Sequence, residues 1–295
     1  MPTRVFWYMA VAVLAFSVPV YGAVNGGSSS ADIADVDLDI NLLPFVVGGA
    51  TLEGNFENLL PSSGTAPAPY NDSNNLLNLD LDSGNLPGVV TVVDIMAGTV
   101  TTTASSNVDN LLGPRMSLGS FSVENLDLSV ADLPLLVPDL VSITADALTV
   151  TSTVTGDFGS ALATGVMEVT NLQVFVSGVQ VGATLNGTSA PNTGIDIDTV
   201  LGGASLILNQ QILTGDGINQ VGIITNAIAL QISNVGIAGV GTINGSAIIG
   251  PTQASLSLQP AAVPEPSSLL LLSSMGVGAA YRYRKRKQVT AEPGS

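Results

Sequence analysis

The chain of 295 residues contains no cysteine and no histidine. The lack of cysteine excludes disulfide bonds and thiol chemistry. Without either residue, Ser-His-Asp catalysis, Cys-His catalysis and histidine-based zinc sites are excluded as well. Phe, Tyr and Trp together number 13, although clefts that cleave sugars usually stack aromatic rings on the substrate. These absences predict a protein that is not an enzyme.

Basic residues are also scarce, and six of the seven lie near the chain ends. Between residues 24 and 262 there are 21 acidic residues and one basic residue, Arg115, so this body has a formal charge of −20. Binding to phosphate needs clustered Lys and Arg, so the body is predicted not to bind nucleic acid. Apolar residues make up 46% of the chain, which is too many for a disordered acidic segment, and the body is predicted to fold.

The N-terminus has the pattern of a secretory signal peptide. Arg4 precedes an apolar stretch from Val5 to Val18, and small residues around Gly22 and Ala23 suit signal peptidase. We therefore expect a helical signal peptide over residues 1–23 and export of the remainder of the chain. Residues 24–30 are rich in Gly and Ser and are predicted to be a linker.

The C-terminus combines a proline-flanked acid, an apolar run and a basic cluster. Pro264 and Pro266 favour an extended segment that a processing enzyme can bind. The apolar run from Leu269 to Ala280 is a dozen residues, whereas a membrane-spanning helix needs about 20. The basic residues behind it are expected to stay on the cytoplasmic side. The residues of this pattern are Val263, Pro264, Glu265, Pro266, Arg282, Arg284, Lys285, Arg286 and Lys287.

This arrangement over residues 263–287 resembles the PEP-CTERM sorting signal of Gram-negative bacteria, which an exosortase of the inner membrane recognises and cleaves. The resemblance implies that signal peptidase and exosortase are partners during export. It further implies a short hydrophobic helix that holds an intermediate in the inner membrane, with residues 288–295 as a cytoplasmic tail. The processed protein would then reach the cell surface or the extracellular polysaccharide of a biofilm.

The body over residues 31–260 is predicted to be all-β. Segments rich in Val, Ile, Leu and Thr alternate with Gly, Asn, Pro and Asp, and helical periodicity is absent from them. Pro61 to Asn75 is predicted to be a loop. A motif of the type Val-x-Asn-Leu recurs at 123–128, 169–174 and 232–237 without a fixed period, which favours a sandwich-like fold with long strands over the alternative, an irregular β-solenoid. The expected strands are 36–40, 89–103, 116–130, 141–155, 165–181, 204–213, 221–238 and 242–258.

Part of the body, residues 141–254, is similar to the choice-of-anchor P family of bacterial surface proteins. The matching segments are 145–150 (ADALTV), 169–172 (VTNL), 190–193 (APNT), 206–211 (LILNQQ) and 215–217 (GDG). That family is named for its pairing with different C-terminal anchors, the PEP-CTERM segment among them. The resemblance implies surface display and no particular chemistry.

The strongest cofactor candidate is Ca²⁺, since no other cofactor is indicated. Asn78, Asp80 and Asp82 alternate before Ser-Gly, a spacing close to that of an EF-hand loop, although the glycine falls one position late and Val89 stands where Glu is expected. Asp196 and Asp198 are expected on one face of a strand, as are Asp37 and Asp39. The alternative for all of them is a solvated acidic strand face.

The sequence leaves three functions open. The first is a non-enzymatic structural or adhesive role at the cell surface. The second is a module that binds polysaccharide or calcium. The third is a hydrolase that uses two carboxylates, which the absence of the usual catalytic groups disfavours.

Overall fold

The computed structural model describes residues 23–44, 51–83, 91–111, 113–132, 139–237 and 239–260. Residues 23–259 of these ranges belong to one compact unit, Tyr21–Gln259. The predicted signal helix and the predicted C-terminal helix lie outside the described residues. The elements are β1 (Ala23–Ala31), β2 (Ala34–Leu42), β3 (Thr51–Phe56), β4 (Ser62–Thr65), β5 (Tyr70–Ser83), β6 (Thr91–Ser106), β7 (Arg115–Asp132), β8 (Val141–Gly156), β9 (Leu162–Val176), β10 (Val179–Gln180), β11 (Leu185–Ser189), β12 (Thr193–Ile195), α2 (Asp198–Leu201), β13 (Ala204–Gly215), β14 (Gln220–Ile237) and β15 (Gly241–Gln259).

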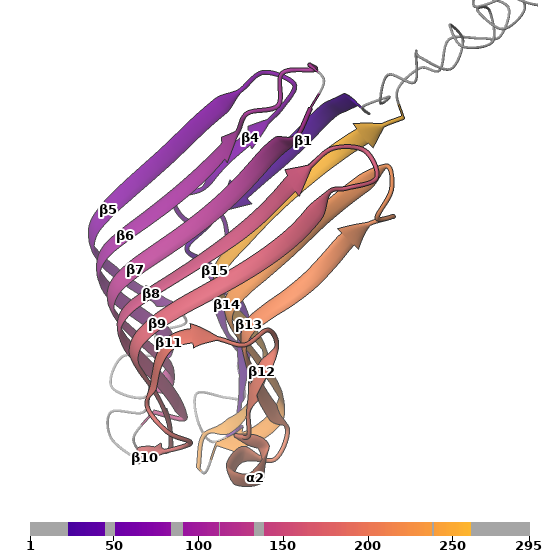
Figure 1. Cartoon of the computed structure of the whole chain (residues 1–295). Helices are drawn as coiled ribbons and strands as arrows, with labels where there is room; N and C mark the ends of the chain where they lie inside the picture. Colours follow the sequence, from indigo (N-terminus) through magenta and orange to yellow (C-terminus); the bar gives the residue numbers. More distant parts are fainter. Residues whose placement is uncertain are drawn as a thin grey trace, which may run out of the picture. The chain divides into compact units, whose positions relative to one another are not determined.

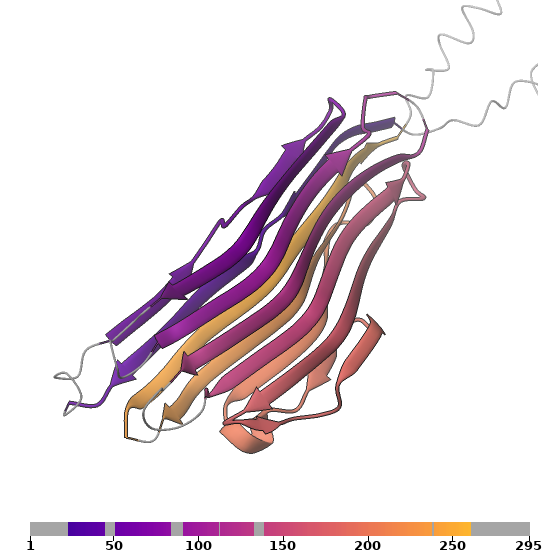
Figure 2. The same cartoon turned by 90° about the vertical axis from the view of Figure 1, so that its left-hand side faces the viewer.

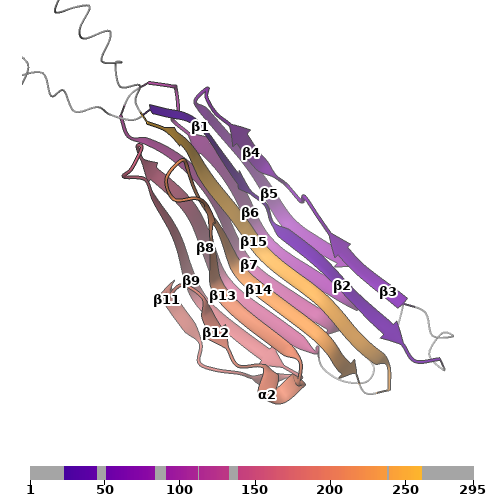
Figure 3. The same ribbon diagram turned by 90° about the vertical axis from the view of Figure 1, so that its right-hand side faces the viewer.

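The strands form two sheets that face each other (Figure 1). One has seven strands in the order β10-β9-β8-β7-β6-β5, with β11 on β9. The other has eight strands in the order β12-β13-β14-β15-β1-β4, with β2 also paired with β15 and β3 paired with β2. Figures 2 and 3 show the long strands of both layers running in nearly the same direction. All pairings among the described strands are antiparallel. The all-β prediction is therefore confirmed, and the solenoid alternative does not describe this topology.

Two local predictions were wrong. The predicted linker 24–30 is part of β1, which pairs with β15 along its length. The predicted loop 61–75 contains β4 and the first half of β5. Gly, Ser and Asn have low strand propensity, but hydrogen bonds from a neighbouring strand overrode that preference in both cases. The helix α2 has four residues and was not predicted.

A row of residues with left-handed or glycine backbone crosses the seven-stranded sheet. Asn78, Asn125 and Asn171 have positive φ values of 57°, 52° and 55°. The register places Gly98 across from Asn78, between Leu77–Thr99 and Leu79–Ala97. It likewise places Asp146 across from Asn125. Left-handed backbone is tolerated best by Gly, Asn and Asp.

This row reverses the alternation of inward and outward side chains without shifting the register. On β7 the buried positions are odd-numbered up to Val123 and even-numbered from Leu126. The same change occurs on β9 between Val169 and Leu172. Strands β5 to β9 bend along their length (Figure 1), and Asn78, Asn125 and Asn171 lie in the interior of β5, β7 and β9. The first two copies of the recurring Val-x-Asn-Leu motif form this feature, in which two inward aliphatic residues flank a left-handed asparagine. In the third copy Asn234 also has a positive φ, of 54°, but it lies on β14 at a register shift between Ile232 and Val235.

The eight-stranded sheet has an equivalent row. Asn209 on β13 has a φ of 50°, and Gly250 on β15 has a φ of 62°. Along β15 the chain changes partner at this level, since Ala31 of β1 pairs with Thr252 and Ala34 of β2 pairs with Ile249. The two residues between β1 and β2, Asp32 and Ile33, therefore lie beside Gly250 and Pro251, with backbone hydrogen bonds from Asp32 N to Pro251 O and from Gly250 N to Ile33 O.

The interior holds a larger and a smaller cluster of buried aliphatic residues, and in one part the two sheets lie closer together. The larger cluster of buried aliphatic residues includes Leu38, Ile95, Leu128 and Ile243. Elsewhere the two sheets approach so closely that a Cβ on Gly119 would collide with the carbonyl oxygens of the facing sheet. A smaller cluster of buried aliphatic residues, which includes Val154, Ile223 and Leu256, shares this part with buried hydroxyl groups that bond between the sheets.

Hydroxyl hydrogen bonds connect the two sheets where they lie closer together. Ser152 Oγ lies 2.8 Å from Thr225 Oγ1 and 2.9 Å from Thr252 Oγ1. Ser62 Oγ lies 2.9 Å from Thr102 Oγ1. These side chains are at most 1% exposed. Buried polar groups are costly without partners, and here the partners come from the opposite sheet, which holds the layers in one register.

Candidate binding groove

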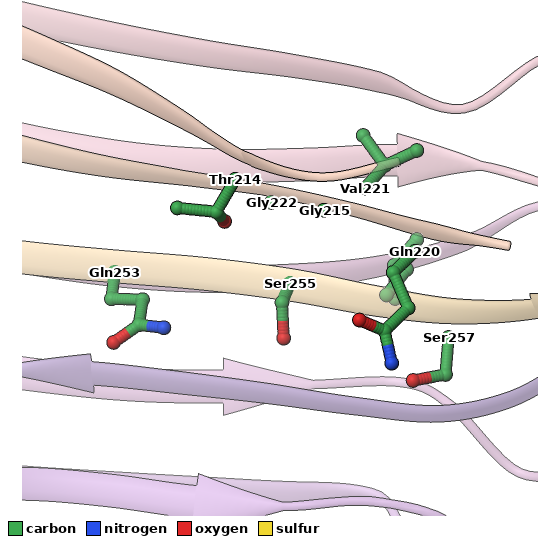
Figure 4. Close-up of a pocket in the computed structure, with 9 residues that line it drawn as sticks. Thr214, Gly215, Gln220, Val221, Gly222, Gln253, Ser255 and Ser257 are labelled. Atoms are coloured by element: carbon green, nitrogen blue, oxygen red, sulfur yellow. The ribbon is translucent and has the colours of Figure 1, made fainter. Parts of the chain in front are cut away.

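A groove runs along the outer face of the eight-stranded sheet. On β15 the outward residues Gln253, Ser255 and Ser257 alternate with buried residues. Together with Thr214 and Gln220 they line a hollow of about 220 Å³. Figure 4 shows Gln253, Ser255 and Ser257 in a line along one strand, with the Gln220 amide close to Ser257. The side chains that offer hydrogen bonds in this upper hollow are uncharged amides and hydroxyls.

A second, lower hollow of about 230 Å³ shares Gln253 with the first. It lies where β1 gives way to β2 along β15. Asp32 and Asn58 supply polar atoms, while Ile224 and Pro251 supply apolar surface. The two hollows are called the groove below.

Asp32 is the acidic residue of the groove. Its Oδ1 accepts the N–H of Ile33 at 2.7 Å. Burial raises the pKa of the Asp32 carboxyl to about 6, although this hydrogen bond acts in the opposite direction. Arg115 is the one basic residue in the described part of the chain, and it pairs with Asp109 at 2.6 Å. The partly desolvated carboxylate of Asp32 thus has no cationic partner in the described part of the protein.

Further acids lie beyond the lower hollow on the same face. Asp37, Asn55 and Glu57 line an adjacent open depression, and Glu57 precedes Asn58 of the groove. Asp37 and Asp39 lie on β2 with outward-facing positions, as predicted. The groove therefore passes from uncharged amides and hydroxyls at one end to carboxylates at the other.

The calcium candidates are not brought together by the fold. Asn78, Asp80 and Asp82 lie in the extended strand β5, not in a loop that can wrap an ion. In the described ranges, no group of three or more acidic residues has the geometry to hold a metal ion. Calcium binding stays a prediction.

The expectation that Asp196 and Asp198 share a strand face was wrong, because both lie after β12. Asp196 Oδ1 accepts the N–H of Thr199 at 3.3 Å, and Asp198 Oδ1 accepts the N–H of Gly203 at 2.6 Å. Both carboxylates therefore satisfy backbone donors around the short helix α2, where the chain turns into β13.

The outer face of the seven-stranded sheet carries a separate acidic group around Asp94. Asp82 is opposite Asp94 in the register, and Asp127 is on the next strand. Burial, followed by repulsion from Asp80 and Asp127, raises the pKa of Asp94. The Oδ1 atom of Asp94 is buried and has no hydrogen-bond partner in the described part of the chain. This face is thus strained electrostatically at neutral pH.

Sequence reasoning did not find the groove. The sequence shows Gln253, Ser255 and Ser257 as the polar face of one strand. It does not show which strand lies beside that face, because β1 and β15 are far apart in the sequence and come together only in the fold. Asp32 was visible only as one acid among several. No local signal marks it as the residue that faces a hollow where β1 gives way to β2.

The predicted sorting residues Val263, Pro264, Glu265, Pro266, Arg282, Arg284, Lys285, Arg286 and Lys287 lie outside the described residues. None of the helical segments in the described ranges has the length and apolarity to cross a bilayer.

Comparison with known proteins identifies the C-terminal segment. No curated protein matches the chain. A crystal structure of a Pseudomonas aeruginosa FadL homologue covers 81% of this chain and 90% of its own, at 10% identity and a TM-score of 0.18. A similarity at that TM-score carries no argument about fold or function. Residues 262–287 match the PEP-CTERM protein-sorting motif, and a signal of this kind implies export through the membrane to the cell surface and processing by an exosortase.

Proposed function

We propose that the mature chain is a non-enzymatic structural or adhesive component of the cell surface or extracellular polysaccharide matrix of a Gram-negative bacterium. The observation that carries the proposal is the sorting motif at residues 262–287, which follows a folded, strongly acidic body. The resemblance of residues 141–254 to the choice-of-anchor P family agrees with surface display. Signal peptidase and exosortase are the partners that this route requires.

The way the sheet edges are protected supports a durable extracellular role. A free edge strand invites pairing with other chains. On one side, Asp72 Oδ2 of β5 accepts the N–H of Ser63 at 3.1 Å, and Asn74 Nδ2 donates to Pro61 O at 2.8 Å. On the other side, Gln211 Nε2 of β13 donates to Gly165 O of β9 at 2.7 Å. Side chains thus connect the two sheets at both sides, in a protein without disulfide bonds.

The proposal predicts that cells need the chain for cohesion and not for turnover of a substrate. A strain that lacks the chain should show reduced cell-to-cell or cell-to-matrix cohesion under shear, and the intact chain should restore it. The purified chain should leave matrix polysaccharide at its original length. Unchanged cohesion in the deletion strain would remove the adhesive role. Shortened polysaccharide that depends on one carboxylate would instead favour the two-carboxylate hydrolase.

A further inference from the structure

The groove on the eight-stranded sheet has the chemistry of a binding site for an extended, hydroxyl-rich chain. From Pro251 to Ser257 it follows β15 for seven residues, and the six steps between them span about 20 Å at the rise of a strand. The amides of Gln220 and Gln253 offer both donors and acceptors, and the hydroxyl groups of Thr214, Ser255 and Ser257 offer the same. These groups match the hydroxyl groups of a sugar chain, which also both donate and accept.

The lower hollow adds two features that narrow the class of ligand the groove can bind. Ile224 and Pro251 line it with apolar surface, on which the C–H face of a sugar ring can rest. Asp32 places a half-buried carboxylate beside them, and the described part of the chain supplies no cation to that carboxylate. A ligand that carries an ammonium group would form a charge-assisted hydrogen bond there.

The negative charge of the body disfavours the binding of an anionic polysaccharide. With a formal charge of −20 between residues 24 and 262, the body repels polyanions over distances comparable to the Debye length. The charge gradient along the outer face, from the uncharged upper hollow to Asp37 and Glu57, favours a chain that bears positive groups along its length.

We propose that this groove binds an extended polysaccharide of amino sugars with free amino groups, with Asp32 as the residue that pairs with an ammonium group and Gln253 as the central contact between the two hollows. This proposal rests on the adhesive role proposed above and gives it a ligand class. It assigns the groove, and not the acidic face around Asp94, because the groove combines apolar surface, amides and hydroxyl groups with the carboxylate of Asp32.

The test is calorimetric titration of the purified full chain with a partly deacetylated chito-oligosaccharide at moderate salt. Asp32→Asn should weaken binding about tenfold to hundredfold, the range expected for losing a charge-assisted hydrogen bond. Asp146→Asn is the matched control, because it removes the same charge from an exposed site on the other sheet, and it should leave the affinity unchanged. Ser255→Leu should obstruct the upper hollow and weaken binding while Asp32 is intact. A cooperative thermal transition of each variant would show that it is folded.

Three results would overturn the proposal. One is the absence of binding by the wild-type chain. Another is equal affinity for the fully acetylated oligosaccharide, which would make the groove a neutral glycan site. The third is equal weakening by Asp32→Asn and Asp146→Asn together with tight binding of oligolysine, which would show diffuse attraction to the acidic body. If the titration shows no binding of the oligosaccharide in the groove while the deletion strain still loses cohesion, the adhesive role remains and depends on another surface.

Discussion

The left-handed asparagines are predicted to be required for the bend of the sheets, and Asn125 provides the clearest test. Its φ is 52°, and its side chain is exposed, so a substitution there changes the backbone preference more than the packing. A side chain other than Gly, Asn or Asp costs about 1–2 kcal/mol in left-handed backbone. A β-branched residue is expected at the upper end of this range.

We therefore expect Asn125→Val to lower the free energy of unfolding by about 2 kcal/mol. Asn125→Gly should change it by less than about 0.5 kcal/mol, because glycine adopts this conformation without steric cost. The adjacent exposed residue supplies the control, and Glu124→Val should be close to neutral.

The assay is urea denaturation followed by circular dichroism, with the slope of the transition compared among variants. An unchanged slope with a shifted midpoint would show that only stability changed. The role assigned to Asn125 is refuted if Asn125→Val is as stable as Asn125→Gly. It is also refuted if Glu124→Val is destabilised as strongly as Asn125→Val. The loss of stability would then come from placing valine at an exposed position and not from the left-handed backbone of residue 125.

Three further predictions concern the interior, pH and calcium. Gly119→Val should lower the free energy of unfolding by about 3 kcal/mol or more, because the new side chain collides with the carbonyl oxygens of Ser30 and Gln253. Gly236→Ala is the control: Gly236 has open space around it, and this change should be nearly neutral in the same denaturation assay. Burial raises the pKa of Asp32 to about 6, so the folded state binds more protons than the unfolded state between about pH 4 and 6. The free energy of unfolding should therefore fall as pH rises through this window. Scanning calorimetry should give a higher melting temperature at pH 4.5 than at pH 7, and Asp32→Asn should reduce this difference. If Ca²⁺ binds at Asp80 and Asp82, millimolar Ca²⁺ should raise the melting temperature more than Mg²⁺ does, and a chain that shows neither heat nor a shift would exclude the site.

The sequence predicted the class of the fold because strand composition is a property of each segment by itself. Runs of Val, Ile, Leu and Thr marked the long strands, and the predicted strands 141–155 and 204–213 fall within β8 and β13. It failed where pairing overrides composition. The Gly and Ser residues of β1 form a strand because β15 and β4 flank them on both sides.

The repeated asparagine motif was visible in the sequence, but its meaning was not. Asn125 and Asn171 interrupt the period-two pattern of β7 and β9 at equivalent rows, and the interruption makes sense only once the strands are aligned. The groove is a stronger case, since Asp32 and Gln253 are 221 positions apart in the sequence and meet through the pairing of β1 with β15. The sorting signal, in contrast, is contiguous in the sequence, and for that reason it was found without a structure.

Exosortase processing is tested most directly by the intact mass of the chain recovered from a PEP-CTERM host with and without its exosortase. We predict a shorter protein at the surface of the exosortase-containing strain, cut within residues 262–287, and a longer, membrane-retained form in the strain that lacks the enzyme. Chains of the same mass at the surface of both strains would contradict this sorting route.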